Sequence, residues 1–208
     1  MKNKILLLPC LFLICIILIG TRTANADGSI IAVVPSSQSV NAPDLLFTVN
    51  FTITGAPIMT QWIIRNITWN PDVCELQTLN KSSFVEGPFM KSVGSTTGLM
   101  TKAPDNVTGR APEVFVGFMG SDTVSGDGVL MTIKFRSKAV GYSNVSMQIA
   151  YLLNGLDSLP NPTLQNGTVT VIPEFSNVLL PIFLVATTMI AYIAATLTRK
   201  RRAQIRVP

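Results

Sequence analysis

The sequence predicts an all-β fold, an antiparallel sandwich of short strands, between two apolar ends of the chain. Apolar and polar residues alternate with a period of two along several runs between residues 27 and 172, as in strands with one buried face. Helical periodicity is scarce there, and Gly, Pro, Asn and Asp separate the runs. Short strands without intervening helices pack as two sheets around one core.

The N-terminus has the pattern of a secretory signal helix at residues 1–26. Lys2 and Lys4 precede an apolar run that ends at Ile19, shorter than the roughly 20 residues of a membrane span. Ala24-Asn25-Ala26 has the small-x-small pattern of a cleavage site. We predict cleavage after Ala26, with an uncleaved signal anchor as the alternative.

Residues 178–198 predict one transmembrane helix. The 20 residues from 178 to 197 carry no charge, and as a helix they would be about 30 Å long, the thickness of a bilayer core. Four basic residues follow at 199–202 and predict a cytoplasmic tail at 199–208. We therefore expect a single-pass cell-membrane protein, with an extracellular domain at 27–172 and a short linker at 173–177.

Each predicted strand carries one apolar face. The alternating residues are Phe47, Val49, Phe51 and Ile53; Val114, Val116 and Phe118; Met131, Ile133 and Phe135; Val145, Met147, Ile149 and Tyr151; and Val169 and Val171. Two further strands are expected at 29–34 and 59–69. Turns are expected at 55–57, 70–72, 86–88, 125–128, 154–155 and 160–162. Residues 82–112 should form a long excursion with short strands near Phe89 and Leu99.

The net charge of +5 arises at the two ends of the chain. Of the 16 basic residues, three belong to the signal and five to the tail, so the part between keeps eight against 11 acidic residues, a net charge of −3. Such a surface gives no reason to expect nucleic acid. Cys74 is the only cysteine after the signal, which excludes a disulfide within the mature chain. We expect it in the core, with an intermolecular bridge as the alternative.

The chain has no histidine, which excludes Ser-His-Asp, Cys-His and histidine-bearing zinc sites. The carboxylate pairs Asp72 with Glu75 and Asp122 with Asp127 lie in or beside predicted turns, without the facing arrangement that glycoside hydrolysis needs. Residues 122–128 contain oxygen atoms that could bind calcium. They lack the spacing and the closing glutamate of an EF-hand, so we expect a hairpin loop there rather than a calcium site. The prediction is a protein that is not an enzyme and holds no cofactor.

Six Asn-x-Ser/Thr triplets lie outside the two ends, more than composition alone would give. Asn50 lies opposite Phe51 and Asn144 opposite Val145, which places both on polar strand faces. We expect glycosylation at most of the six; the alternative is that Asn and Thr are simply common on β surfaces. The triplets begin at Asn50, Asn66, Asn80, Asn106, Asn144 and Asn166.

Two other features are candidate binding elements. Thr132, Lys134 and Arg136 form an outward stripe on the strand at 129–137, which protects a sheet edge or forms part of a protein-binding face. Trp62 and Trp69 lie seven residues apart and point to opposite faces unless a bulge intervenes. We expect one tryptophan in the core and consider the other as a weak signal for sugar binding.

The sequence contains four segments, Gln61–Leu76, Phe84–Phe89, Val124–Phe135 and Asn166–Val171, whose motifs and order resemble the cohesin domain family. The resemblance extends over residues 29–172. The resemblance implies a jelly-roll sandwich of about nine strands, related to carbohydrate-binding modules, that binds dockerin modules through one sheet face. One extra residue between the two tryptophans suggests a bulge, and this chain has no duplicated Asp-rich dockerin segment of its own.

Pro173-Glu174-Phe175, before the predicted span and its basic tail, resembles the PEF-type C-terminal sorting signals of archaeal surface proteins. That resemblance implies removal of the span by a sortase-like membrane enzyme and its replacement by a lipid. A permanent anchor is the alternative.

The leading hypothesis is therefore a membrane-anchored docking domain of an archaeal cell surface, which holds a dockerin-like or other envelope protein. A carbohydrate-binding module that acts on polysaccharide and a structural envelope protein without a specific ligand are the alternatives. A flat sheet face free of glycosylation triplets would favour docking, and an exposed coplanar row of aromatic rings would favour carbohydrate. Triplets on every face would favour the structural role.

Overall fold

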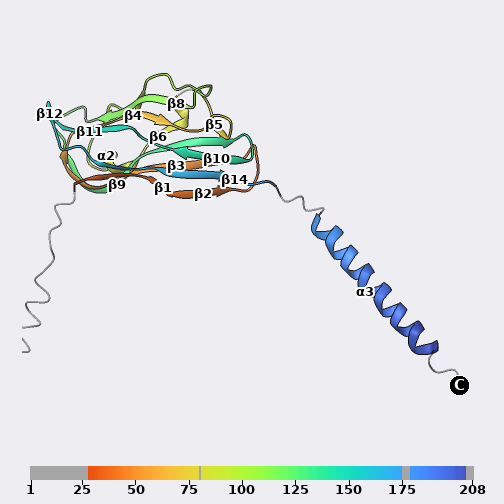
Figure 1. The fold of residues 1–208 in the computed structure, drawn as a ribbon. Helices are drawn as coiled ribbons and strands as arrows, with labels where there is room; N and C mark the ends of the chain where they lie inside the picture. The colour runs from red at the N-terminus through yellow and green to blue at the C-terminus, as the bar shows by residue number, and fades with distance from the viewer. Residues whose placement is uncertain (1–27, 80, 175–178, 205–208) are drawn as a thin grey trace, which may run out of the picture.

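The computed structural model describes residues 28–79, 81–174 and 179–204 of the chain. Its strands form two packed layers, with β1 and β2 at the bottom and β4 and β8 at the top (Figure 1). The predicted signal at 1–26, the cleavage site after Ala26, Asn80 and Phe175 lie outside the described residues.

Three sheets make up the sandwich. The β3 sheet has the order β13 (Thr163–Gln165), β1 (Ile30–Val34), β3 (Leu46–Met59), β9 (Val124–Ser137) and β5 (Cys74–Leu76), and β6 (Phe84–Glu86) also pairs with β9. The β4 sheet has the order β12 (Asp157–Ser158), β11 (Ile149–Asn154), β4 (Gln61–Thr68), β8 (Arg110–Gly117) and β7 (Met100–Thr101). The β14 sheet has the order β10 (Gly141–Val145), β14 (Gly167–Val171) and β2 (Ser37–Val40).

The sheets are not purely antiparallel as predicted, because the last strands of the domain lie beside the first. β13 pairs with β1 and β14 pairs with β2, both in parallel, and the whole domain serves as the crossover that parallel pairing requires. The described residues form 14 strands rather than about nine. One reason is Pro35, which has no N–H for the ladder and separates β1 from β2.

The period-2 pattern correctly predicts the central strands. Phe51 and Ile53 of β3 and Ile133 and Phe135 of β9 are buried, as are Val114 and Val116 of β8. The ring of Phe135 stacks on Phe47 with centroids 5.5 Å apart, and it meets Trp69 edge-on at the same distance. Cys74 is buried and free, as expected of a small core residue.

The predicted strand at 145–151 is divided between two sheets. β10 ends at Val145 and β11 begins at Ile149, and the chain passes from the β14 sheet to the β4 sheet between them. The inward positions of β11 are Ala150 and Leu152, which leaves Ile149 exposed. The prediction that Ile149 shares the buried face of Val145 is therefore wrong, because the change of sheet resets the alternation.

Two predicted turns, at 55–57 and at 125–128, are irregularities within long strands. They lie in β3 and β9, whose pairing shifts register between Ile53 and Ala56. Gly55 and Gly126 have φ of 66° and 97°, a region that glycine adopts without steric cost. The backbone N–H of Gly55 donates to Asp127 Oδ1 at 2.7 Å, so this stretch of 122–128 belongs to the ladder and does not form the expected hairpin loop.

Both tryptophans belong to the core, which corrects the expectation that one is exposed. Trp62 and Trp69 are 0% and 4% exposed. No residue is inserted in β4, since Arg65 pairs with Glu113 and Ile67 with Ala111. The alternation changes phase at Asn66, which has a φ of 54°. A left-handed backbone, rather than the extra residue of the suggested bulge, turns both rings inward.

The excursion at 82–112 contains β6, β7 and two short helices, η1 (Lys81–Ser83) and α2 (Pro88–Lys91). Phe89 therefore lies in a helical turn rather than in a predicted strand. Pro88 favours the first helical position, where its missing N–H costs little. Phe89 and Met90 are buried, and the Phe89 ring fills the space that a side chain at Gly128 would occupy.

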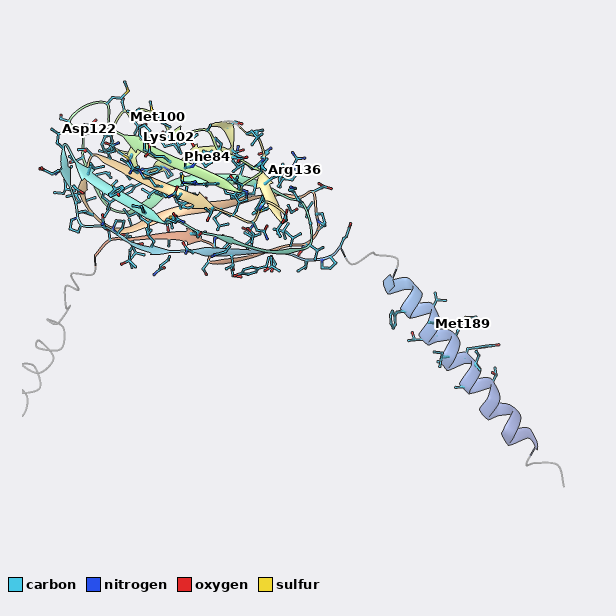
Figure 2. All side chains as sticks on the ribbon, turned by 45° about the horizontal axis from the view of Figure 1, so that its top comes forward. Phe84, Met100, Lys102, Asp122, Arg136 and Met189 are labelled. Carbon is cyan, nitrogen blue, oxygen red and sulfur yellow. The ribbon has the colours of Figure 1, made fainter. Side chains whose placement is uncertain are left out.

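The C-terminal helix α3 (Leu179–Gln204) lies apart from the sandwich (Figure 1). It covers most of the segment predicted as a span at 178–198 and part of the predicted tail. Within the described residues, no helix is long and apolar enough to cross a membrane. Large apolar side chains along α3, among them Met189 (Figure 2), are exposed.

Candidate functional site

A row of apolar side chains crosses the outer face of the β4 sheet. Tyr151 of β11 pairs with Ile63 of β4, Ile63 with Phe115 of β8, and Phe115 with Met100 of β7. Directly paired residues share one face of a sheet. The row points away from the core because it alternates with buried residues in β4, β8 and β11. Met100 is 40% exposed, and the other three are half-buried.

A charged row runs beside the apolar one. Glu113 accepts from Arg65 Nε at 2.7 Å and from Lys102 Nζ at 2.9 Å, and Lys102 lies close to Met100 at the top of the sandwich (Figure 2). The Arg65 guanidinium also lies over the Tyr151 ring, 5.4 Å from its centroid. Exposed ion pairs contribute little stability, so their main effect is to hold these side chains in a fixed pattern beside the apolar row.

The Glu113 carboxylate gives the charged row a pH dependence. Its hydrogen bond from Lys102, together with Arg65, holds the pKa of Glu113 below the ordinary 4.5. A lowered folded-state pKa stabilises the fold above the unfolded pKa, and this stabilisation is lost as the pH falls through the folded pKa. Below about pH 4.5, the melting temperature of the wild type should therefore fall more steeply than that of Glu113→Gln. Parallel curves of melting temperature against pH would contradict this role.

One end of the β4 sheet is closed by an amide cluster. Asn66 Nδ2 donates to Gln148 Oε1 at 3.0 Å, and Asn66 Oδ1 accepts from Arg110 through Nε at 3.1 Å and through Nη2. Both polar atoms of the Asn66 side chain are therefore engaged. This glycosylation triplet borders the apolar row without lying in it.

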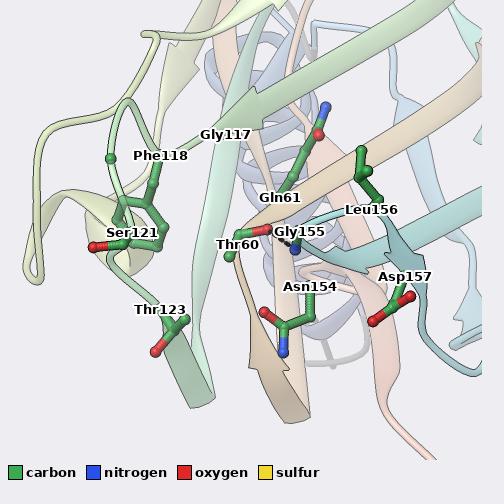
Figure 3. A pocket seen from close by; sticks show the side chains of 11 residues that line it. Thr60, Gln61, Gly117, Phe118, Ser121, Thr123, Asn154, Gly155, Leu156 and Asp157 are labelled. Atoms are coloured by element: carbon green, nitrogen blue, oxygen red, sulfur yellow. Dashed lines mark hydrogen bonds between the residues drawn. The ribbon is translucent and has the colours of Figure 1, made fainter.

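The other end of the β4 sheet opens into a pocket of about 700 Å³ (Figure 3). The turn at 154–157 and the loop at 118–123 form its walls. Thr60 Oγ1 accepts from the N–H of Gly155 at 2.9 Å and donates to the carbonyl of Leu153 at 3.2 Å, which fixes that turn. Phe118 presents a half-buried ring, and most other lining side chains are polar. The pocket is open and can hold a small polar ligand only loosely.

The stripe predicted as a partner site lies on the other layer. Thr132, Lys134 and Arg136 face outward from β9, which is flanked by β3 on one side and by β5 and β6 on the other. Protection of a sheet edge is therefore the wrong interpretation. Thr132 Oγ1 donates to Asn50 Oδ1 at 2.7 Å, and Arg136 pairs with Glu75 at 3.5 Å, so two of the three side chains have partners within the sheet.

The remaining sequence candidates are scattered. Pro173 and Glu174 are exposed after β14. Asp72 lies in the predicted turn after Asn70, whose Oδ1 accepts its N–H. Among the described residues, no three His, Cys, Asp or Glu side chains are grouped to hold a metal ion. The sequence did contain a signal for the apolar row, since Ile63, Phe115 and Tyr151 are apolar at positions that alternate with the core residues of their strands.

Asn106 closes the free edge of β5. Its Oδ1 accepts from the N–H of Leu76 at 2.8 Å, and its Nδ2 donates to the carbonyl of Leu76 at 3.2 Å. Asn106→Ala leaves both backbone groups unpaired and should lower the free energy of unfolding by about 1–3 kcal/mol. The exposed Asn144, without a side-chain hydrogen bond in the described part of the chain, gives the control: Asn144→Ala should change it by less than about 0.5 kcal/mol. Thermal unfolding of unglycosylated protein measures both changes. Equal losses of unfolding free energy in the two variants would contradict a stabilising role for the two hydrogen bonds between Asn106 and Leu76.

Neither a family model nor a curated protein matches the sequence. Solved structures do match. A type II cohesin domain from the cellulosome of Acetivibrio cellulolyticus has a TM-score of 0.53 at 13% identity, with 68% of this chain and 95% of that chain covered. A non-cellulosomal cohesin from the hyperthermophilic archaeon Archaeoglobus fulgidus has a TM-score of 0.51 at 16% identity, with 71% and 94% covered. A type I cohesin from Pseudobacteroides cellulosolvens has 0.52 at 13%, with 70% and 93% covered. The sandwich therefore has a cohesin-like fold.

Proposed function

We propose that the sandwich is a non-catalytic docking domain that holds a protein partner on the outer face of the β4 sheet. The observation that carries this proposal is the apolar row of Tyr151, Ile63, Phe115 and Met100, next to the ion pairs of Glu113. An apolar centre with charged groups at its side is the composition of a protein interface. The resemblance to cohesins supports the same role and suggests a dockerin-like partner.

The shape of this face favours a protein over a polysaccharide. The apolar row mixes aliphatic and aromatic side chains across the four strands β11, β4, β8 and β7. Such a mixture suits the irregular surface of a folded partner. Among the described residues of the sandwich, Tyr142 is the only exposed aromatic residue, and the others are buried or half-buried. No coplanar row of exposed rings is therefore present there. Among the triplets that the structure describes, the one in β4, at Asn66, lies at the border of this face with its amide engaged.

The proposal includes display at the cell surface, as a single-pass protein with its N-terminal domain outside and its C-terminal tail in the cytoplasm. Three features support it: the signal pattern at 1–26, the uncharged segment at 178–197 and the basic residues after it. Intact-mass measurement of the protein from its own membranes tests this proposal. A mass that begins at Asp27 and includes Pro208 supports a permanent anchor. A mass that ends near Phe175 with a lipid supports sorting.

Docking is tested with the unglycosylated full chain, immobilised in mild detergent and exposed to the envelope proteins of its own source. We expect retention of a defined protein, identified by mass spectrometry, that then binds as a purified component with saturable one-to-one stoichiometry. Excess soluble wild-type chain should compete for it. Absence of any saturable binding by the purified candidate would overturn the proposal.

Carbohydrate binding is the second candidate, because the pocket beside Thr60 joins the Phe118 ring to polar side chains that include Asn154 and Asp157. A ring under hydroxyl-binding groups is the chemistry of sugar recognition. A glycan array with wild type and Phe118→Ala tests it. Sugar binding by the wild type that is lost in Phe118→Ala would assign sugar to this pocket. The docking assay with envelope proteins is independent of this result.

A further inference from the structure

The asparagines of the described glycosylation triplets differ in exposure and in the hydrogen bonds of their side-chain amides. In three of them the side-chain amide is tied into the structure: both polar atoms of Asn66 and of Asn106 are hydrogen-bonded, and Asn50 lies half-buried on a central strand with its Oδ1 bonded to Thr132. Asn144 and Asn166 are exposed, and no described residue bonds to their Nδ2 atoms.

We infer that the folded protein carries N-linked glycans at Asn144 and Asn166, and none at Asn66 or Asn106. The inference rests on the proposed display outside the membrane, where a lipid-linked oligosaccharide donor is available. Transfer joins the asparagine Nδ2 to the anomeric carbon of the sugar. Nδ2 loses one proton, the bond from that carbon to the phosphate oxygen breaks, and the lipid phosphate leaves with the electron pair.

The order of glycosylation and folding does not change this selection. After folding, a transferase needs an exposed amide with a free nitrogen, which Asn144 and Asn166 offer. Before folding, any triplet is reachable, but a sugar on Nδ2 of Asn106 or Asn66 leaves a single N–H there and has to fit where that nitrogen contacts the carbonyl of Leu76 or Gln148 Oε1. Strain or loss of these hydrogen bonds destabilises the fold, so those glycosylated forms fold less well.

The two free asparagines lie together on the β14 sheet. Asn144 of β10 pairs with Thr168 of β14, which in turn pairs with Ser37 of β2. Asn166 directly precedes β14, and its Oδ1 accepts the N–H of Met147 at 3.0 Å. The hydroxyl-bearing side chains beside them leave room for a bulky solvated group. β14 and β2 lie at the bottom of the sandwich and the β4 sheet at its top (Figure 1), so a glycan on Asn166, beside β14, leaves the proposed docking face open.

Tyr142 gives the Asn144 glycan a surface to pack on. It precedes Asn144 by two residues on β10, and both are exposed while Ser143 and Val145 are buried. Residues two apart on a strand share a face at about 7 Å. Tyr142 is 58% exposed, and the C–H face of the first sugar can cover its ring. Packing of a sugar on this ring accounts for an exposed aromatic residue in an otherwise small, polar surface.

Peptide mapping of the full chain from its own membranes tests the assignment. No basic residue lies between Lys138 and Arg199, so trypsin leaves Asn144 and Asn166 on one peptide. Cleavage before Asp157 separates them. We expect a glycan mass on both peptides and bare asparagines at 66 and 106. A glycan at Asn66 or Asn106, or bare Asn144 and Asn166 in a chain whose first peptide begins at Asp27, would overturn the inference while export stands.

A double-mutant cycle tests the packing on Tyr142. In glycosylated protein, Tyr142→Ala should lower the melting temperature, and in the Asn144→Gln background it should not. Equal shifts in both backgrounds would show that Tyr142 does not support the sugar. The docking assay uses unglycosylated chain, so its failure and failure of the glycan assignment are separate results.

Discussion

Phe135→Ala is expected to lower the free energy of unfolding by about 3–5 kcal/mol, the usual cost of removing a fully buried aromatic side chain. Phe135 is 0% exposed, stacks on Phe47 of β3 and meets Trp69 after β4 edge-on. The variant therefore opens a cavity where the two layers meet. Against a total stability of about 5–15 kcal/mol, the loss removes a large part of the margin. Unfolding of the full chain in mild detergent, followed by tryptophan emission, measures it.

Phe115→Ala is the matched control, because it removes the same ring from the outer face. Phe115 is half-buried on β8 and touches the apolar row rather than the core. We expect a loss near 1 kcal/mol, since part of its apolar area is already exposed to water. Equal losses in the two variants would mean that Phe135 does not have the central position that its contacts indicate.

The regular parts of this fold follow from local pattern, and the departures come from pairing. β3 and β9 are evident in the sequence because β3 alternates strictly from Leu46 to Ile53 and β9 from Met131 to Ser137, with Phe51 and Phe135 on the buried side. Gly55 and Gly126 carry the local signal of a turn, yet they lie in paired strands. No local pattern tells a turn from a bulge when the partner strand decides the outcome.

The candidate binding surfaces were harder to predict for a related reason. The outward stripe on β9 was correctly placed on a solvent face, but its neighbours β3 and β5 come from distant parts of the chain. Sequence alone therefore could not show that β9 is central. The apolar row on the β4 sheet was missed because stretches such as Ile63-Ile64 and Phe115-Val116 are apolar on both strand faces, and the alternation signal does not tell which of the two faces is the outer one until the sheet is assembled.

Ile63→Lys is expected to weaken partner binding by about 30-fold or more, which corresponds to the 2 kcal/mol or greater loss of an interface hot spot. Ile63 lies at the middle of the apolar row, between Tyr151 and Phe115. Lysine there introduces a charge that the partner must desolvate, next to the existing cations of Arg65 and Lys102. Isothermal titration with the purified partner measures the change, and the melting temperature verifies that the fold is intact.

Thr132→Lys separates the two candidate faces. Thr132 and Ile63 are both half-buried, outward residues on central strands, but they belong to opposite layers. The same introduced side chain should leave affinity within about twofold at Thr132, because surface changes away from an interface are nearly neutral. The reverse result, with binding lost at Thr132 and kept at Ile63, would move the docking surface to the β3 sheet and to the stripe of Lys134 and Arg136. Since the two variants share their chemistry and differ only in the layer they occupy, this comparison assigns the face independently of what the partner is.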